Sequence, residues 1–173
     1  MTIVVMVCTG DNKYNKNDVA NIEYQLHNVG FDYDRAHVIT RGEGSVYDKL
    51  KMFEQCKKDE NYVYFDLDLI IKDPIDVVRD EFTLLFAWWR PPFHTPLNSS
   101  IIAWRGDRSD IAKNFKREKY DKGIDEYFYK EVEYKIYDRI AWSWYWDNRI
   151  HDFPVCLLNH NVETPEWTTE YMP

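Results

Sequence analysis

Two carboxylates stand directly after an apolar run in the segment YVYFDLDLIIKDP, residues 62–74. Asp66 and Asp68 are two residues apart, and in an extended chain residues at that spacing point to the same side. Two carboxylates on one side, with no cysteine nearby, suit a hard cation such as Mg²⁺ or Mn²⁺. Because such an ion usually keeps positions open for water and substrate phosphates, the pair predicts a metal site that holds a phosphorylated ligand.

This prediction depends on where the pair lies in the sequence, because the Asp-x-Asp spacing alone is uninformative in a chain so rich in aspartate. A second Asp-x-Asp pair, Asp32 and Asp34, lies in a polar, loop-like stretch. Asp66 and Asp68 instead follow what reads as a buried strand, and ligands of open α/β sheets bind at the carboxyl ends of the strands. The alternative is that the pair merely ends a strand at the solvent.

The elements that must position the pair read as strands and helices in alternation. The predicted strands are apolar runs bounded by turn residues: 3–8, 36–40, 62–66, 82–87, 99–104 and 153–158. The predicted helices are a stretch from Asn17 or Asp18 to Gly30, a second from Ser45, residues 108–118 and most of 124–148. Aromatic clusters at 127–129 and 142–146 keep a strand open as the alternative inside the last of these. The order strand–helix–strand–helix–strand predicts α/β architecture with a parallel sheet.

Length, charge and cysteine content narrow the function. The 173 residues suit one domain. A net charge of −8 with no basic cluster argues against a nucleic-acid partner and against an anionic membrane surface. No apolar run approaches the ~20 residues of a membrane span, and the N-terminus lacks a signal-peptide pattern, so we expect a cytoplasmic protein with no integral membrane segment. The three cysteines form no CxxC motif, so neither a structural zinc site nor a disulfide framework is indicated.

Several segments, in order along the chain, resemble the GT-A glycosyltransferases, and in particular the glycogenin and bacterial galactosyltransferase group. FDLDLIIKDPID, residues 65–76, is similar to the metal-binding strand of that family. LNSSIIAW, residues 97–104, resembles its Phe-Asn-Ser-Gly strand, with Ser100 in place of the glycine. GIDEYF, residues 123–128, resembles its Asp-Gln segment, and NHNVETPEW, residues 159–167, resembles its C-terminal His…Pro-Trp stretch.

The resemblance implies a GT-A fold for one domain over residues 1–173, a three-layer α/β/α sandwich with a mostly parallel central sheet. The donor-binding part would cover about residues 1–75, and the acceptor-binding and catalytic part about residues 76–173. The implied function is a metal-dependent transfer of a sugar from a nucleoside-diphosphate sugar to a saccharide or another hydroxyl acceptor. A UDP-sugar is the favoured donor, and the oligomeric state stays open.

The resemblance also assigns roles to individual residues. The implied donor-binding residues are Thr9, Gly10, Asp11, Tyr14, Lys49 and Asn98, with Lys49 placed in a segment similar to the family's aromatic-x-Lys-Leu run. The implied ligands of Mn²⁺ or Mg²⁺ are Asp66, Asp68 and His160. The implied catalytic residues are Asp125 and Glu126. An inverting enzyme needs such a carboxylate as a base, a retaining enzyme does not, and the likeness leans towards retention.

The aromatic residues, 17% of the chain, have two predicted roles. Trp104, Trp142 and Trp146 are predicted to lie in the core. Trp88 and Trp89 follow a predicted strand on the ligand side of the sheet. Their flat rings would stack on the sugar or acceptor, or equally well fill the space beneath a proline-rich loop.

Two other functions remain open at the level of sequence. One is a phosphohydrolase of the haloacid-dehalogenase type with Asp66 as nucleophile, although that motif normally continues into Gly-Thr. The other is a non-catalytic, nucleotide- or sugar-binding remnant of the GT-A fold. A purely structural role is the alternative for each of the remaining candidates: Lys49, Asn98, Asp125, Glu126 and His160.

Overall fold

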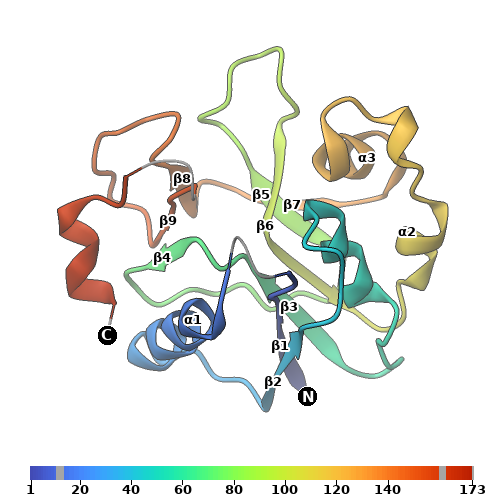
Figure 1. Cartoon of the computed structure of the whole chain (residues 1–173), viewed down its shortest axis with the longest axis horizontal. Coiled ribbons are helices and arrows are strands. Elements are labelled where there is room, and N and C mark those ends of the chain that lie inside the picture. The colour runs from blue at the N-terminus through green and yellow to red at the C-terminus, as the bar shows by residue number, and fades with distance from the viewer. Residues whose placement is uncertain (11–13, 160–162, 173) are drawn as a thin grey trace.

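Mostly apolar residues form the inner strands of a six-stranded central sheet (Figure 1). The computed structural model describes residues 1–10, 14–159 and 163–172. The strands stand in the order β2-β1-β3-β6-β5-β7. Their bounds are β1 Thr2–Val7, β2 Arg35–Ile39, β3 Asn61–Phe65, β5 Thr83–Phe86, β6 Leu97–Arg105 and β7 Lys135–Tyr137.

The sheet is mostly parallel, as predicted. β1 pairs in parallel with β2 and β3, and β5 pairs in parallel with β7. β6 runs the other way, because it is antiparallel to both β3 and β5. The start of β6 therefore lies at the same edge of the sheet as the carboxyl ends of β1, β2 and β3.

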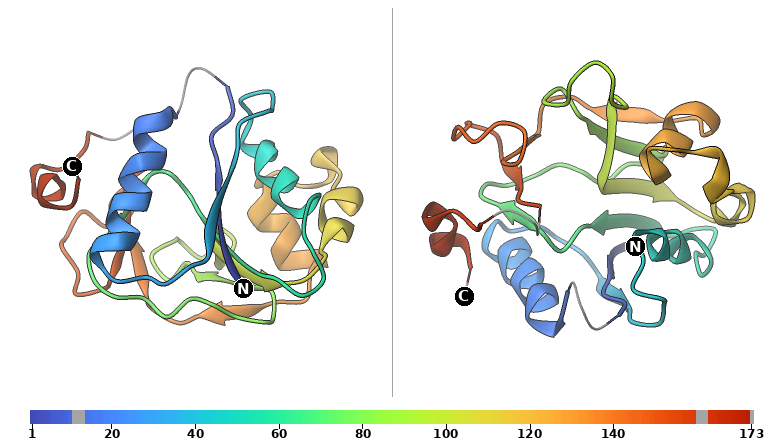
Figure 2. Two further views of the ribbon diagram at one scale, coloured as in Figure 1. Left: turned by 90° about the horizontal axis from the view of Figure 1, so that it is seen from below. Right: turned by 45° about the horizontal axis from the view of Figure 1, so that its top comes forward.

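Successive residues of a strand point to opposite faces of the sheet, so the apolar residues of the strands form one core on each face. On one face, Val4 and Met6 pack with helix α1, Lys16–Asn28. On the other face, Ile3 and Val5 pack with residues of three helical elements: the 3-10 helix η1 Val46–Phe53, α2 Ser109–Asn114 and α3 Gly123–Glu131. Helices thus cover both faces and form the predicted three-layer sandwich (Figure 2).

A second, smaller sheet lies on the α1 side of the molecule. Its strand order is β4-β9-β8, with bounds β4 Leu69–Ile71, β9 Val155–Leu157 and β8 Ala141–Ser143. All three strands are buried and share one core with α1. Two short 3-10 helices, η2 Arg117–Lys119 and η3 Glu166–Tyr171, complete the described elements. No helix in the described part of the chain has the length and apolarity needed to cross a membrane.

One long segment of the second half departs from its prediction. The helix predicted over most of 124–148 is wrong beyond Glu131, where α3 ends and Val132 becomes extended. The chain then forms β7 and β8, each only three residues long. Pairing with β5 and β9 decides the conformation there against the local helical pattern. The six predicted strands are confirmed to within two residues at each end.

A buried side-chain amide closes the outer edge of β4. Gln25 of α1 is 2% exposed. Its Nε2 donates to the Leu69 carbonyl at 3.3 Å, and its Oε1 accepts from the Ile71 N–H at 2.6 Å. Because buried backbone groups need partners, this one side chain satisfies two of them and ties α1 to the small sheet.

We expect Gln25→Leu to lower the free energy of unfolding by about 2–4 kcal/mol, because two buried backbone groups lose their partners. Urea unfolding followed by circular dichroism measures the change. Tyr24→Leu is the matched control, since Tyr24 is an exposed neighbour on the same helix. It should change stability by less than about 0.5 kcal/mol. Equal stability of the two variants would contradict this role of Gln25.

Candidate active site

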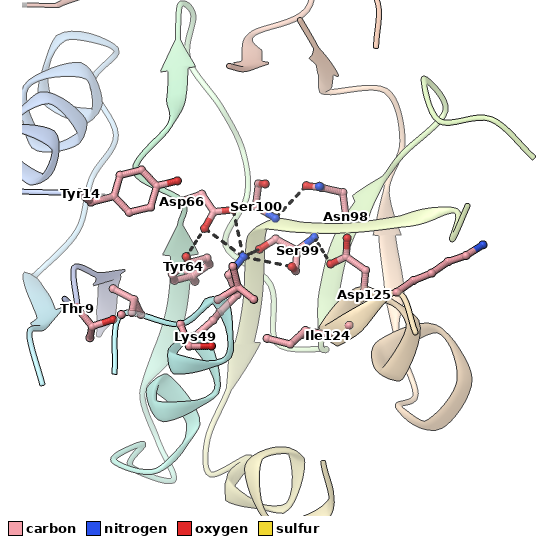
Figure 3. A pocket seen from close by; sticks show the side chains of 16 residues that line it. Thr9, Tyr14, Lys49, Tyr64, Asp66, Asn98, Ser99, Ser100, Ile124 and Asp125 are labelled. Carbon is pink, nitrogen blue, oxygen red and sulfur yellow. Dashed lines mark hydrogen bonds and ion pairs between the residues drawn. The ribbon is translucent and has the colours of Figure 1, made fainter. Parts of the chain in front are cut away.

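A cavity of about 290 Å³ opens at the edge of the sheet where β1, β2 and β3 end (Figure 3). Its volume is close to the lower end of the range for small-molecule sites, ~300 Å³. Six of the predicted site residues line it: Thr9, Tyr14, Lys49, Asp66, Asn98 and Asp125. These residues come from both sides of position 75, and the predicted division into two functional parts at that position stays a prediction.

A second cavity of about 190 Å³ adjoins the first. The two share Asp66, Asn98 and Ser100, and the second adds Asp68 and Trp89 to the lining. Both carboxylates of the Asp-x-Asp pair therefore face one connected region. Two further candidates, Asp11 and His160, lie outside the described residues.

An irregular stretch of β6 turns the backbone of Ser99 towards the first cavity. The register between β5 and β6 shifts between Leu84 and Leu85, which leaves Ser99 without a ladder partner on β5. Its N–H donates instead to Asp125 at 3.1 Å, and its carbonyl accepts from Lys49 Nζ at 3.0 Å. Irregularities of this kind often re-aim groups near functional sites. Ser99 was not among the predicted site residues, because a register shift leaves no mark in the sequence.

Asp66 is held by a cation and by a hydroxyl group. Lys49 Nζ lies 3.1 Å from both carboxylate oxygens, and the Tyr64 hydroxyl donates to Oδ1. Burial raises the pKa of Asp66, but Lys49 and hydrogen bonds from Tyr64 and Ser100 outweigh it, so the pKa lies below its ordinary value. The carboxylate is therefore ionised at neutral pH. Tyr64 was not predicted, although its position two residues before Asp66 places it on the same face.

Tyr14 stands beside both carboxylates of the pair, and its ring reaches towards Asp66 (Figure 3). Burial raises the pKa of Tyr14 far above its ordinary value. The charges of Asp68 and Asp66 and a hydrogen bond with Asp68 raise it further. The phenol therefore stays protonated and serves as a hydrogen-bond donor next to the carboxylates.

The carboxylate pair fits a hard divalent cation as a minimal site. Among the residues described, no three His, Cys, Asp or Glu side chains are grouped closely enough to hold a metal ion by themselves. Mg²⁺ is commonly bound by only one or two carboxylates, with water and substrate phosphates completing its coordination. Asp66 and Asp68 supply these two carboxylates, and the chemistry of the donor set agrees with Mg²⁺ or Mn²⁺.

The two catalytic candidates have different surroundings. Asp125 lines the cavity and accepts a hydrogen bond from Arg90 Nη2 at 2.8 Å, so its carboxylate is fixed in place. Glu126 is not among the lining residues of the cavity; it bonds Lys130 Nζ at 2.5 Å and the Lys122 N–H at 2.8 Å. The hydrogen bond from Lys130 lowers the pKa of Glu126. Arg90 was not predicted, because its link to Asp125 spans 35 residues of sequence.

Two loops make close contact at the wall of the cavity, after β1 and after β2. Gly10 has a φ of +76°, and a Cβ at this position would lie 2.5 Å from the Cα of Gly44. The Thr9 hydroxyl donates to the buried carboxylate of Asp48 at 2.7 Å. Both predicted donor-binding residues thus have a packing role in shaping this wall.

We expect Gly10→Ala to lower the free energy of unfolding by about 1–3 kcal/mol more than Gly30→Ala does. Both glycines have positive φ, so both variants strain the backbone, but a Cβ at Gly30 meets nothing within 4 Å. At Gly10 the loop that carries Gly44 must move as well. Thermal unfolding of the two variants measures the difference, and equal melting temperatures would contradict a tight contact between the loops.

The tryptophans do not all lie where they were predicted. Trp104 and Trp142 are fully buried, as expected. The prediction of Trp146 as a core residue is wrong, because it is 39% exposed on the loop after β8 and lines the second cavity. Trp89 lines that cavity too, whereas Trp88 packs against the core of the small sheet and donates to the Ala141 carbonyl.

Comparison with known proteins identifies the fold. No protein-family model matches the chain, and no curated protein matches it in sequence. Solved structures do match it in fold. A glycosyltransferase involved in the glycosylation of the major capsid of PBCV-1 is 11% identical with a TM-score of 0.61, over 97% of this chain and 96% of that one.

Two further solved structures extend the comparison. The galactosyltransferase LgtC, in complex with donor and acceptor sugar analogs, is 12% identical with a TM-score of 0.64, over 98% of this chain and 94% of that one. The glycosyltransferase GlyE of Streptococcus pneumoniae is 10% identical with a TM-score of 0.66, over 99% of this chain and 60% of that one. The strand order, the layers and these neighbours agree, and the chain has a GT-A-like glycosyltransferase fold.

Proposed function

We propose that this protein is a metal-dependent glycosyltransferase that uses a nucleoside-diphosphate sugar, with a UDP-sugar favoured, and a hydroxyl acceptor. The observation that carries the proposal is the meeting of Asp66, Asp68, Lys49 and Asp125 in two connected cavities at the carboxyl edge of the sheet. Ligands of α/β sheets bind at that edge. The presence of donor and acceptor sugar analogs in the LgtC complex supports sugar substrates for this fold.

The donor would lie across the first cavity. Asp66 and Asp68 would hold Mn²⁺ or Mg²⁺, which when bound supplies positive charge to the diphosphate leaving group. Lys49, which lines this cavity, would bind a further phosphate oxygen. Thr9 and Tyr14 also line this cavity, and we place the nucleoside beside them and the turn at Gly10. The amide of Asn98 stands at the junction of the two cavities.

The transfer step exchanges one bond to the anomeric carbon of the donor sugar for another. The oxygen of the acceptor hydroxyl bonds to this carbon, and the bond to the phosphate oxygen breaks with its electron pair left on the diphosphate. The proton of the hydroxyl passes to that phosphate oxygen. Asp125, fixed by Arg90, accepts a hydrogen bond from a hydroxyl of the sugar and orients it. Glu126 has no part in this scheme.

The phosphohydrolase alternative gains no support from the geometry. The nucleophile of that motif normally follows the first strand of the chain and continues into Gly-Thr, whereas Asp66 follows β3 and the pair continues into Leu-Ile. The fold is also that of glycosyltransferases. A non-catalytic nucleotide- or sugar-binding protein would keep the same cavities, and only an activity measurement separates it from an enzyme.

Calorimetric titration with UDP and with GDP, each with Mn²⁺ and with EDTA, tests the proposal. We expect one nucleotide to bind only in the presence of the metal. Absence of metal-dependent binding to both would overturn the proposal. Slow release of free sugar from the matching nucleotide sugar by the wild-type protein would then exclude the non-catalytic alternative.

A further inference from the structure

Three exposed aromatic side chains and one half-buried histidine form a contiguous cluster on two loops. We define the aromatic platform as Phe93 and His94, between β5 and β6, together with Tyr145 and Trp146, between β8 and β9 (Figure 1). Phe93 is 69% exposed, Tyr145 52% and Trp146 39%. Ring centroids lie 4.9 Å apart for Phe93 and His94, 5.1 Å for His94 and Trp146, and 5.0 Å for Tyr145 and Trp146. Exposed aromatic clusters on a soluble fold usually mark a binding surface.

The platform continues into the second cavity. Trp146 belongs to both, and the cavity leads from it to Asp66 and Asp68. Polar groups stand between the two ends, among them the guanidinium of Arg90 and the amide of Asn98. A ligand seated on the platform therefore has a continuous path to the region where we place the leaving group of the donor.

The rings of the platform lie at angles to one another and do not stack face to face, so their faces stay available to a ligand. The planes of Tyr145 and Trp146 meet at 85°, and those of His94 and Trp146 at 64°. Burial lowers the pKa of His94, and Arg90 and Lys122 lower it further, so its ring is uncharged at neutral pH. The platform thus presents several neutral aromatic surfaces at angles to each other.

The loop that carries Trp146 is braced from within. The N–H groups of Trp146 and Asp147 both donate to the Ser143 carbonyl, at 3.1 and 2.9 Å. The Asp147 carboxylate is bonded to Arg149 and to the His151 ring, at 2.8 and 2.9 Å. Because the protein's own residues make these contacts, they hold the aromatic surface in place, which lowers the entropic cost of binding.

We propose that the aromatic platform is the binding site of a saccharide acceptor longer than one sugar ring, an inference that rests on the proposed glycosyl transfer. The C–H faces of sugar rings pack on aromatic rings, while their hydroxyl groups need polar partners. The platform and the second cavity supply these two kinds of contact side by side. A purely apolar partner would leave Arg90 and Asn98 of the cavity facing an apolar surface, whereas a saccharide hydrogen-bonds them.

Binding of defined oligosaccharides tests the proposal. Lactose, maltotriose, cellotriose and chitotriose are examined by saturation-transfer NMR, with and without UDP and Mn²⁺, and the binders are titrated by calorimetry. We expect at least one to bind the wild-type protein. Trp146→Leu should weaken that binding about tenfold or more, because a flat ring is lost while apolar volume is kept. Trp146→Tyr should restore most of the affinity.

Matched controls separate the possible outcomes. Tyr24→Ala removes an exposed aromatic ring from α1, outside the platform, and should bind the saccharide like the wild type. Binding of no saccharide, or equal binding by Trp146→Leu, overturns the proposal. The proposal is also overturned if the wild type attaches to phosphatidylcholine vesicles and Trp146→Leu still attaches to them, because a general apolar surface would give that result. If the wild type binds UDP with Mn²⁺ but no saccharide, only this inference fails; if it binds no nucleotide, the proposed function fails instead.

Discussion

Asp68→Asn should reduce donor turnover on the order of 100-fold or more and remove most of the metal dependence of nucleotide binding. Asparagine has nearly the same shape as aspartate but carries no charge, so it is a poor ligand for a hard cation. Asp68 lines the second cavity where it adjoins the first beside Asp66, which is where we place the cation. Release of free sugar from the nucleotide sugar, measured over a range of Mn²⁺ concentrations, gives both quantities.

The chain contains a matched control for this experiment. Asp32 belongs to the other Asp-x-Asp pair, is exposed, precedes the start of β2, and is not among the residues that line either cavity. Asp32→Asn makes the same chemical change and should leave turnover and metal dependence as in the wild type. Equal effects of the two substitutions, or none for either, would show that Asp68 does not hold the metal.

Lys49→Met should lower the free energy of unfolding at neutral pH by about 3 kcal/mol. The side chains of Lys49 and Asp66 are only 14% and 18% exposed, so the variant leaves a largely buried carboxylate without its cation. Methionine keeps most of the volume of the lysine side chain, so the loss reports charge rather than packing. Urea unfolding measures it.

The effect of Lys49→Met should depend on pH with a defined sign. In the wild type the pKa of folded Asp66 lies below its ordinary value, so the carboxylate contributes stability above the unfolded pKa of ~3.9, and this is lost as pH falls through the folded pKa. Without Lys49, burial dominates and raises the pKa of Asp66, so the variant loses stability as pH rises through that value. The difference between the two proteins should therefore be largest at neutral pH and shrink towards pH 3.

Lys51→Met, on the same 3-10 helix, is the control for this experiment. Lys51 Nζ lies 3.1 Å from Asp48, but its side chain is 37% exposed, and Asp48 keeps its bonds from Thr9 and Ser45. We expect a loss of less than about 1 kcal/mol. An equal loss in both variants would mean that Lys49 has no special relation to Asp66.

The strands that can be predicted from the sequence are those whose apolar residues alone indicate that they are buried. β1 and β3 are apolar at every position after the first, which is typical of strands covered on both faces. The segment after Glu131 was not predictable in the same way. β7 and β8 have three residues each, too few to show a period, and β7 pairs with β5, 52 residues earlier in the sequence.

In the site, the sequence predicts the arrangement of residues that are close together along the chain. Asp66 and Asp68 both line the second cavity, in agreement with the predicted common face, although residues 67 and 68 form a turn between β3 and β4 instead of continuing the strand. Contacts across the fold gave no local signal, and these include the link of Lys49 to Asp66 and that of Arg90 to Asp125. The exposure of Trp146 was not predictable for the same reason. Whether an aromatic residue in an apolar segment is exposed or buried depends on where the tertiary fold places that segment.

The hydrogen bonds that assemble the site also determine when it can exist during folding. They join residues 17 apart for Lys49 and Asp66, 26 for Ser99 and Asp125, and 50 for Lys49 and Ser99. Contacts at such separations form only after long stretches of chain have been closed into loops, at a cost in entropy. A nascent chain that has emerged up to β5 would carry both aspartates but no part of β6 or α3. The binding site is therefore a property of the completed domain, and a partly folded chain cannot engage the donor.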